Sequence, residues 1–144
     1  QMAMASFYFI MAITFFSGIV YLVKEKLGLL FSFASSLFFL ISCVSFLSFI
    51  SLYFYELPTH RCPFCVLQKE YDYIGYLLYA SLLTGVVSGL GVGVLRPFAG
   101  IASLSGSLPL IQKRLTMLCL VSYFIFAGIS IYHIVSTDFT LGVL

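Results

Sequence analysis

Six consecutive residues, His60-Arg61-Cys62-Pro63-Phe64-Cys65, form the densest group of side chains in this chain that could carry out chemistry. They include two of the four cysteines and one of the two histidines. A Cys-x-x-Cys pair is typical of a redox-active dithiol, of half a zinc site or of a structural disulfide. Val66 follows Cys65, so the Cys-x-x-Cys-His pattern of covalent haem attachment is absent. The motif predicts thiol or metal chemistry and leaves the choice between them open.

The residue after the first cysteine indicates how that thiol would be activated. Proline is well suited to the first position of a helix, where its missing N–H would have had no partner. We therefore expect Cys62 at the N-cap of a short interfacial helix over residues 63–69. A thiolate there faces unpaired backbone N–H groups and the positive end of the helix dipole, and both lower its pKa.

The two cysteines receive different predicted roles from this arrangement. His60 and Arg61, if they point inward, would lower the pKa of the first thiol further. We predict that Cys62 is the exposed, attacking sulfur and that Cys65, one turn later, is its resolving partner. His60 and Arg61 are candidate cofactor contacts on the same loop.

The composition is that of a protein in a lipid bilayer. Hydrophobic residues make up 62% and charged residues 8% of the chain, against roughly 45–50% and 25% in soluble domains. We expect an all-α integral membrane protein, a single domain over residues 1–144, because backbone polar groups in lipid must be satisfied within each segment. A bend near residues 72–75 should separate the interfacial helix from the third span. Four apolar stretches reach the length of about 20 residues that a span needs, at about residues 5–23, 27–54, 73–95 and 115–135.

The charges predict an orientation. Lys24 and Lys26 lie between the first two spans, and Arg96, Lys113 and Arg114 lie between the last two. Such basic loops face the cytoplasm, so the cysteine loop and both termini should be extracytoplasmic, where disulfides persist. The net charge of +2 is too small for a nucleic-acid surface.

His133 lies toward the outer end of the fourth span, in the same predicted leaflet as the cysteine loop. An ionisable residue inside a span is a functional hypothesis by default, and we take His133 as a candidate cofactor contact. As an alternative, His60, Cys62, Cys65 and His133 would supply four ligands of the kind that zinc or copper accepts.

Three further patterns concern packing. Gly85, Gly89 and Gly93 recur every four residues in the third span, which predicts close helix contact within the bundle or between subunits. Cys43 and Cys119 differ in depth by roughly 15 Å, too far for a disulfide, and are expected to be small buried hydrophobes. A group of tyrosines predicts an aromatic belt at the outer membrane boundary. A minority of these rings could line a ligand pocket instead. The tyrosines are Tyr53, Tyr55, Tyr71, Tyr73, Tyr76, Tyr79 and Tyr132.

Four spans with an extracytoplasmic Cys-x-x-Cys at the start of a span resemble the bacterial disulfide-bond oxidases of the DsbB type and the vitamin K epoxide reductase family. The resemblance implies a four-helix bundle in the bacterial inner membrane that passes electrons between thiols and a quinone. It also implies that Cys62 and Cys65 are the quinone-proximal pair and Arg61 a quinone contact. Two departures stand out: the chain lacks the second extracytoplasmic cysteine pair of those families, and its predicted outward termini differ from the DsbB pattern.

Three classes of function remain open on the sequence. The first is a membrane thiol–disulfide oxidoreductase that acts on an extracytoplasmic thiol protein and is linked to a quinone. The second is a metal- or cofactor-handling membrane protein. The third is a small subunit of a larger, respiratory-type membrane complex, in which the disulfide is only a clasp and the glycine face is the contact.

Overall fold

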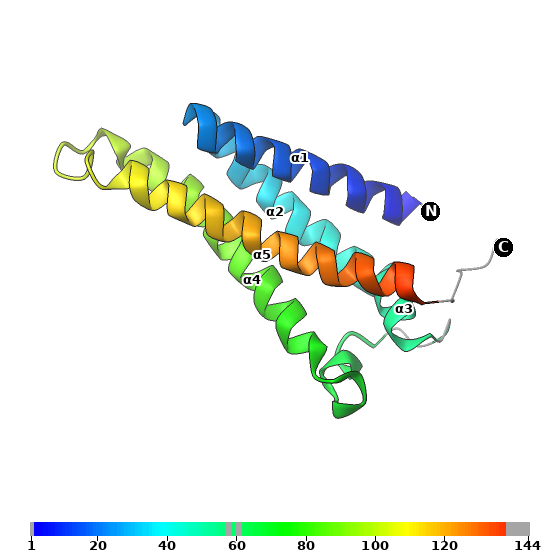
Figure 1. Ribbon diagram of the computed structural model, residues 1–144. Helices are drawn as coiled ribbons and strands as arrows, with labels where there is room; N and C mark the ends of the chain where they lie inside the picture. The colour runs from blue at the N-terminus through cyan, green and yellow to red at the C-terminus, as the bar shows by residue number, and fades with distance from the viewer. Residues whose placement is uncertain (1, 57–58, 60–61, 138–144) are drawn as a thin grey trace.

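Four long helices make up the bundle in the computed structural model, which describes residues 2–56, 59 and 62–137 (Figure 1). The second continues through a π-helical turn, η1 (Phe46–Ile50), into the short helix α3 (Ser51–Tyr55). No strand occurs among the residues described, so the predicted all-α fold is confirmed. The long helices are α1 (Met2–Lys24), α2 (Gly28–Ser45), α4 (Ile74–Leu95) and α5 (Leu108–Ser136).

Each long helical stretch is long and apolar enough to cross a bilayer, with a mean hydropathy between 1.8 and 2.2. The chain is thus an integral membrane protein, and large apolar side chains such as Phe16, Phe33 and Phe124 are exposed on its outer face toward lipid. The fourth helix begins at Leu108, earlier than the predicted residue 115. Pro109 lies in its first turn, where proline is well accommodated.

The centre of the bundle is the packing of α4 against α2 and α5, and the three spaced glycines make it possible. A Cβ on Gly85 would overlap the ring of Tyr123, and a Cβ on Gly89 or Gly93 would overlap the side chain of Ser35 or Ser32. The glycine face therefore lies inside the bundle, which decides a question that the sequence left open.

A buried polar contact joins the same helices. The hydroxyl groups of Ser35 and Tyr123 lie 3.0 Å apart, and the Tyr123 hydroxyl also donates to the Ser35 carbonyl at 3.0 Å. Cys119 lies 3.5 Å from the Ser35 hydroxyl and is fully buried, as predicted. Cys43 is only partly buried, so the prediction for it holds in part.

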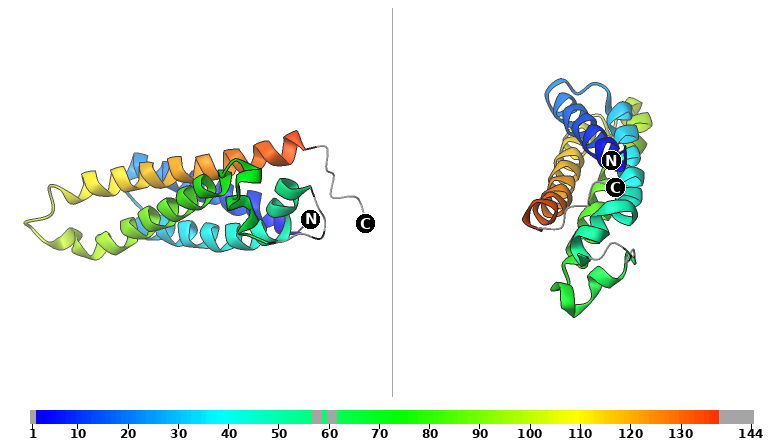
Figure 2. Two further views of the ribbon diagram at one scale, coloured as in Figure 1. Left: turned by 90° about the horizontal axis from the view of Figure 1, so that it is seen from below. Right: turned by 90° about the vertical axis from the view of Figure 1, so that its right-hand side faces the viewer.

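The first helix packs mainly on α2. Thr14 donates a hydrogen bond to the Ala34 carbonyl at 3.2 Å, and the fully buried ring of Phe7 lies 5.6 Å from that of Phe38. Figure 2 shows α1 and α5 as neighbours around the same core, with the α4–α5 connection projecting beyond the α1–α2 turn.

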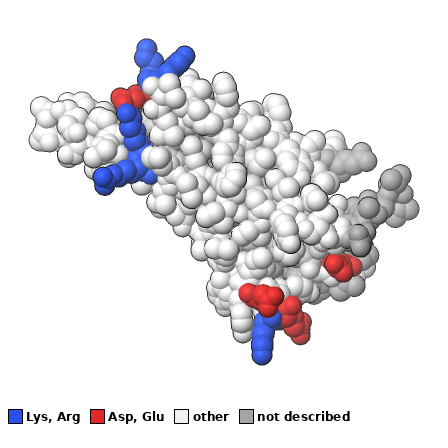
Figure 3. Space-filling view, in the orientation of Figure 1, with Lys and Arg blue, Asp and Glu red and all other residues white. Residues whose placement is uncertain are grey.

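Charge separates along the bundle axis. Figure 3 shows most of the basic side chains at one end of the molecule and most of the acidic ones at the other. The start of α1, the end of α5 and the short helix α3 lie at the second end (Figure 1).

Candidate functional site

The two motif cysteines lie in a tight turn at the acidic end, which we call the cysteine turn (residues 62–65). The predicted single helix over residues 63–69 is wrong, because two short 3₁₀ helices, η2 (Cys65–Leu67) and η3 (Lys69–Tyr71), replace it. Gln68 has an extended conformation between them and interrupts the helical path. Phe64 rather than Cys62 precedes the first helical residue, so the predicted N-cap is also corrected.

The turn nevertheless brings the two sulfurs together. The cysteines approach each other to 3.4 Å as free thiols. The backbone N–H of Phe64 donates to the Cys62 sulfur, and this bond, together with the Cys65 thiol and its backbone N–H, lowers the pKa of Cys62. The same pairing raises the pKa of Cys65, and burial and the Glu70 carboxylate raise it further. The predicted asymmetry is present, and it comes from local N–H groups rather than from a helix dipole.

Two tyrosines hold the turn from the ends of the neighbouring helices. The Tyr55 hydroxyl donates to the Cys62 carbonyl and accepts the backbone N–H of Val66 at 3.0 Å. The Tyr79 hydroxyl donates to the Pro63 carbonyl at 2.5 Å. The Cys62 and Pro63 carbonyls and the Val66 N–H are thus bound by side chains from α3 and α4.

A sharp bend seats the turn on the start of α4. Asp72 and Tyr73 both have positive φ, at 50° and 54°, and α4 begins at Ile74 immediately after them. The bend predicted near residues 72–75 is confirmed. Gly75 is required there, because a Cβ at this position would lie 2.8 Å from the Val66 carbonyl oxygen.

An apolar cavity of about 200 Å³ adjoins the cysteine turn. Its walls come from α2, η1, α4 and α5, and Pro63 and Phe64 of the turn itself form one side. A cavity of about 150 Å³ with apolar walls holds benzene, so the space is that of one apolar ring. The other lining residues are Cys43, Phe46, Leu47, Leu78, Tyr79, Leu82 and Phe126.

A larger groove of about 820 Å³ lies between α1 and α5. Apolar side chains such as Met11, Phe15 and Phe124 line it. Such a groove on a membrane span fits lipid chains and brings no thiol into reach, so we do not assign it to the site.

Of the other predicted site residues, the structure describes only His133, which lies near the end of α5 beside α3. His60 and Arg61 are outside the described residues, so their predicted roles stay predictions. The ring of His133 lies 4.0 Å from that of Phe54 and 5.8 Å from that of Tyr132. Within residues 2–56, 59 and 62–137, no three His, Cys, Asp or Glu side chains gather as metal ligands would.

The role of Tyr55 and Tyr79 was missed in the sequence, where both were assigned to the aromatic belt. Tyr73, Tyr76 and Tyr132 are exposed as belt residues are, by 52%, 61% and 67%. Tyr55 is buried, and Tyr79 lines the cavity, as a minority of the tyrosines was expected to do. The available signal was their position, because both lie just inside the two helices that flank the motif.

The opposite pKa shifts of the two thiols predict different reactivity toward an alkylating agent. Only the thiolate reacts, so Cys62 should react with iodoacetamide at a lower pH than an ordinary thiol, and Cys65 at a higher pH. Peptide mass spectrometry of the reduced protein, labelled between pH 5 and 10, measures both profiles. The Cys65→Ala variant, which lacks the side-chain donor to the Cys62 sulfur, should shift the Cys62 profile toward higher pH. Faster labelling of Cys65 than of Cys62 at pH 7 contradicts this geometry.

Removing the Tyr55 hydroxyl should loosen the cysteine turn. Tyr55→Phe leaves the N–H of the fully buried Val66 without its acceptor and the Cys62 carbonyl without its donor. Stability should fall by about 1–3 kcal/mol, the cost of an unsatisfied buried group. Unfolding in detergent measures it, and the exposed Tyr132→Phe is the control. Equal stability of Tyr55→Phe and Tyr132→Phe would show that the Tyr55 hydrogen bonds do not stabilise the cysteine turn.

Fold and site define a class: a four-span, all-helical membrane protein with a dithiol turn at one end of the bundle. Comparison with models of protein families, with curated proteins and with solved structures gives no match to this chain. Function must therefore be inferred from the site itself.

Proposed function

We propose that this chain is a membrane thiol–disulfide oxidoreductase that acts through Cys62 and Cys65 and delivers electrons to a quinone. The observation that carries the proposal is the pair of thiols 3.4 Å apart, with the pKa of Cys62 lowered and that of Cys65 raised. A structural clasp needs no such difference, whereas a dithiol that exchanges with a partner does.

The reaction has two half-steps. A thiolate of a dithiol protein attacks the Cys62 sulfur, the bond between the two motif sulfurs breaks, and Cys65 leaves as a thiolate and takes up a proton. The second thiol of the partner then attacks the mixed disulfide, so the partner leaves oxidised and the cysteine pair is reduced. Attack at Cys62 is favoured because Cys65 packs against the hydrophobic core.

In the second half-step the reduced pair loses two electrons and two protons and regains its disulfide, and the quinone gains both and becomes a quinol. The apolar cavity beside Pro63 and Phe64 supports this acceptor, because its volume fits one ring. The Tyr79 hydroxyl and the Cys43 thiol add the only polar side-chain atoms of its described lining. The proposal agrees with the resemblance to DsbB-type oxidases and needs no second cysteine pair, since the partner reacts with Cys62 directly.

Thiol-driven quinone reduction by the purified protein tests the proposal. Dithiothreitol serves as the dithiol and a short-chain ubiquinone as the acceptor, and the ultraviolet absorbance of the quinone gives the rate. We expect catalytic turnover and a disulfide between the motif cysteines after oxidation. A protein whose pair stays reduced in the presence of excess quinone would refute the quinone half of the proposal. A pair that forms a disulfide but never exchanges with dithiols would refute the thiol half.

A further inference from the structure

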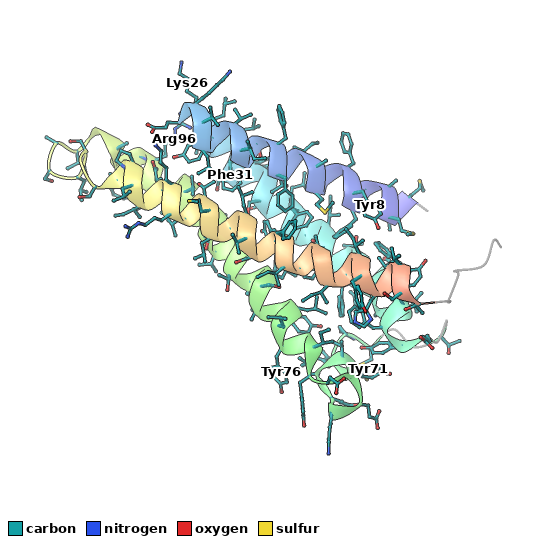
Figure 4. The ribbon with its side chains drawn as sticks, viewed as in Figure 1. Tyr8, Lys26, Phe31, Tyr71, Tyr76 and Arg96 are labelled. Atoms are coloured by element: carbon teal, nitrogen blue, oxygen red, sulfur yellow. The ribbon has the colours of Figure 1, made fainter. Side chains whose placement is uncertain are left out.

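The end of the bundle opposite the cysteine turn carries a concentration of positive charge. Glu25 is the single carboxylate there among the described residues. Figure 4 shows Lys26 and Arg96 at this end, with Tyr71 and Tyr76 at the other. The cationic surface, as we call it, consists of Lys24, Lys26, Arg96, Lys113 and Arg114.

Contacts between helices make these residues one surface. Lys113 on α5 forms an ion pair of 2.5 Å with Glu25 in the α1–α2 turn. The guanidinium of Arg96, at the end of α4, lies 3.5 Å from the position of a Cβ on Gly28, at the start of α2. The cations of three separate chain segments are therefore held at the same end of the spans.

An uncharged, exposed segment borders this surface. Residues 97–112 contain no charged side chain, and they form the 3₁₀ helix η4 (Arg96–Gly100), a turn and the start of α5. Phe98, Ile101 and Leu104 are 47%, 45% and 42% exposed. Apolar side chains beside a row of cations are typical of protein surfaces that lie in the headgroup region of a membrane.

We propose that the cationic surface binds anionic phospholipid, with its exposed cations on the phosphate and acidic headgroup and the neighbouring apolar segment among the acyl chains. Five cations against one carboxylate complement a negative headgroup. A nucleic acid or an acidic protein matches the charge but not the exposed apolar side chains beside it. Each cation near an anionic membrane surface contributes about fivefold to the affinity.

Lipid titration of the purified full chain in neutral detergent, followed by native mass spectrometry, tests this. The probes are dioleoyl phosphatidylglycerol and dioleoyl phosphatidylcholine, which share their acyl chains and differ in charge. We expect tighter binding of phosphatidylglycerol. Lys26→Gln should weaken it about fivefold and Lys26→Gln/Arg114→Gln about 25-fold, while binding of phosphatidylcholine stays unchanged. Both residues are exposed, and helical content by circular dichroism checks that the variants fold.

Lys69→Gln is the matched control, because it removes one exposed lysine at the opposite end of the bundle. Equal losses for Lys26→Gln and Lys69→Gln, or equal affinities for the two lipids, would overturn the proposal. Displacement of phosphatidylglycerol by an equal concentration of inorganic phosphate would also overturn it, in favour of a small-anion site. Unchanged binding of both lipids by Phe98→Ser/Leu104→Ser would remove the apolar segment from the proposed site. None of these readouts depends on the thiol reaction.

Discussion

Replacing Cys62 with serine should reduce thiol-driven quinone reduction to the uncatalysed background rate. The serine hydroxyl cannot form the mixed disulfide with a dithiol partner, and it cannot close a disulfide with Cys65 for the quinone to regenerate. The rate is measured in detergent with dithiothreitol and a short-chain ubiquinone. Because the Cys62 thiol is at the surface end of the bundle and makes no core contact comparable to that of Cys65, the variant should unfold at the same temperature as the natural chain.

Two further variants show whether the loss of activity in Cys62→Ser is specific to the cysteine pair. Cys65→Ser keeps the Cys62 thiolate but removes its resolving partner. When oxidised glutathione is added, the Cys62 thiolate should displace one glutathione as a thiolate and retain the other as a mixed disulfide, which mass spectrometry detects. Cys119→Ala removes a thiol in the fully buried core of the bundle and should leave the rate unchanged. Full activity of Cys62→Ser, or equal loss in Cys119→Ala, is incompatible with the proposed site.

The second large effect is expected on folding, from Gly89→Leu. The Cβ alone would overlap the hydroxyl of Ser35 and lie 2.6 Å from its Cβ and 3.3 Å from the Cys119 sulfur. The leucine must therefore push α4 away from α2 and displace the Ser35 side chain, which disturbs the hydrogen bond between Ser35 and the Tyr123 hydroxyl on α5. Overpacking of a close-packed core costs 1–3 kcal/mol and more where backbones approach, and we expect a loss of about 3 kcal/mol or greater.

Gly128→Leu is the control for this prediction. Gly128 also lies in a membrane-spanning helix, but a Cβ there meets nothing within 4 Å. Both variants lose the same flexibility of glycine and gain the same apolar side chain, so their difference isolates the helix contact. Thermal unfolding in detergent should give a clearly lower midpoint for Gly89→Leu alone. Similar midpoints would mean that the helices can separate at this position without cost.

The fold was accessible from the sequence because a bilayer restricts the choices. Apolar stretches long enough to span a bilayer form helices, so the number and order of the spanning helices could be predicted from the number and order of these stretches. The exact start of α5 could not be predicted from the sequence. Residues 97–112 are uncharged and mostly apolar, and they carry no signal for where the turn ends. The sequence also could not show whether Gly85, Gly89 and Gly93 pack within the bundle or between subunits, because this depends on the residues of α2 and α5 that they contact.

The site was only partly predictable. The motif predicts Cys62 and Cys65 as the candidate thiols, and the physics of thiolates near N–H groups predicts that the pKa of Cys62 is the lower of the two, as the structure has it. Their roles in a reaction stay predictions. The form of the turn did not, because Tyr55 and Tyr79 fix its carbonyl groups from outside the motif. Local preference at Pro63 favours a regular helix, and these two tertiary hydrogen bonds hold a tighter turn instead.

The position of Tyr55 depends on the backbone conformation of the π-helical turn η1. A π turn contains one residue more than an α turn, and every residue of an α-helix accounts for about 100° of rotation. If the residues of Phe46–Ile50 formed a regular α-helix instead, α3 would be rotated by about that angle, which would carry the Tyr55 hydroxyl away from the Cys62 carbonyl. The geometry of the thiols at one end of the bundle thus depends on a π turn earlier in the same span. A deletion of one residue that also removes the π turn would leave α3 in its present orientation, whereas an α turn of unchanged length would not.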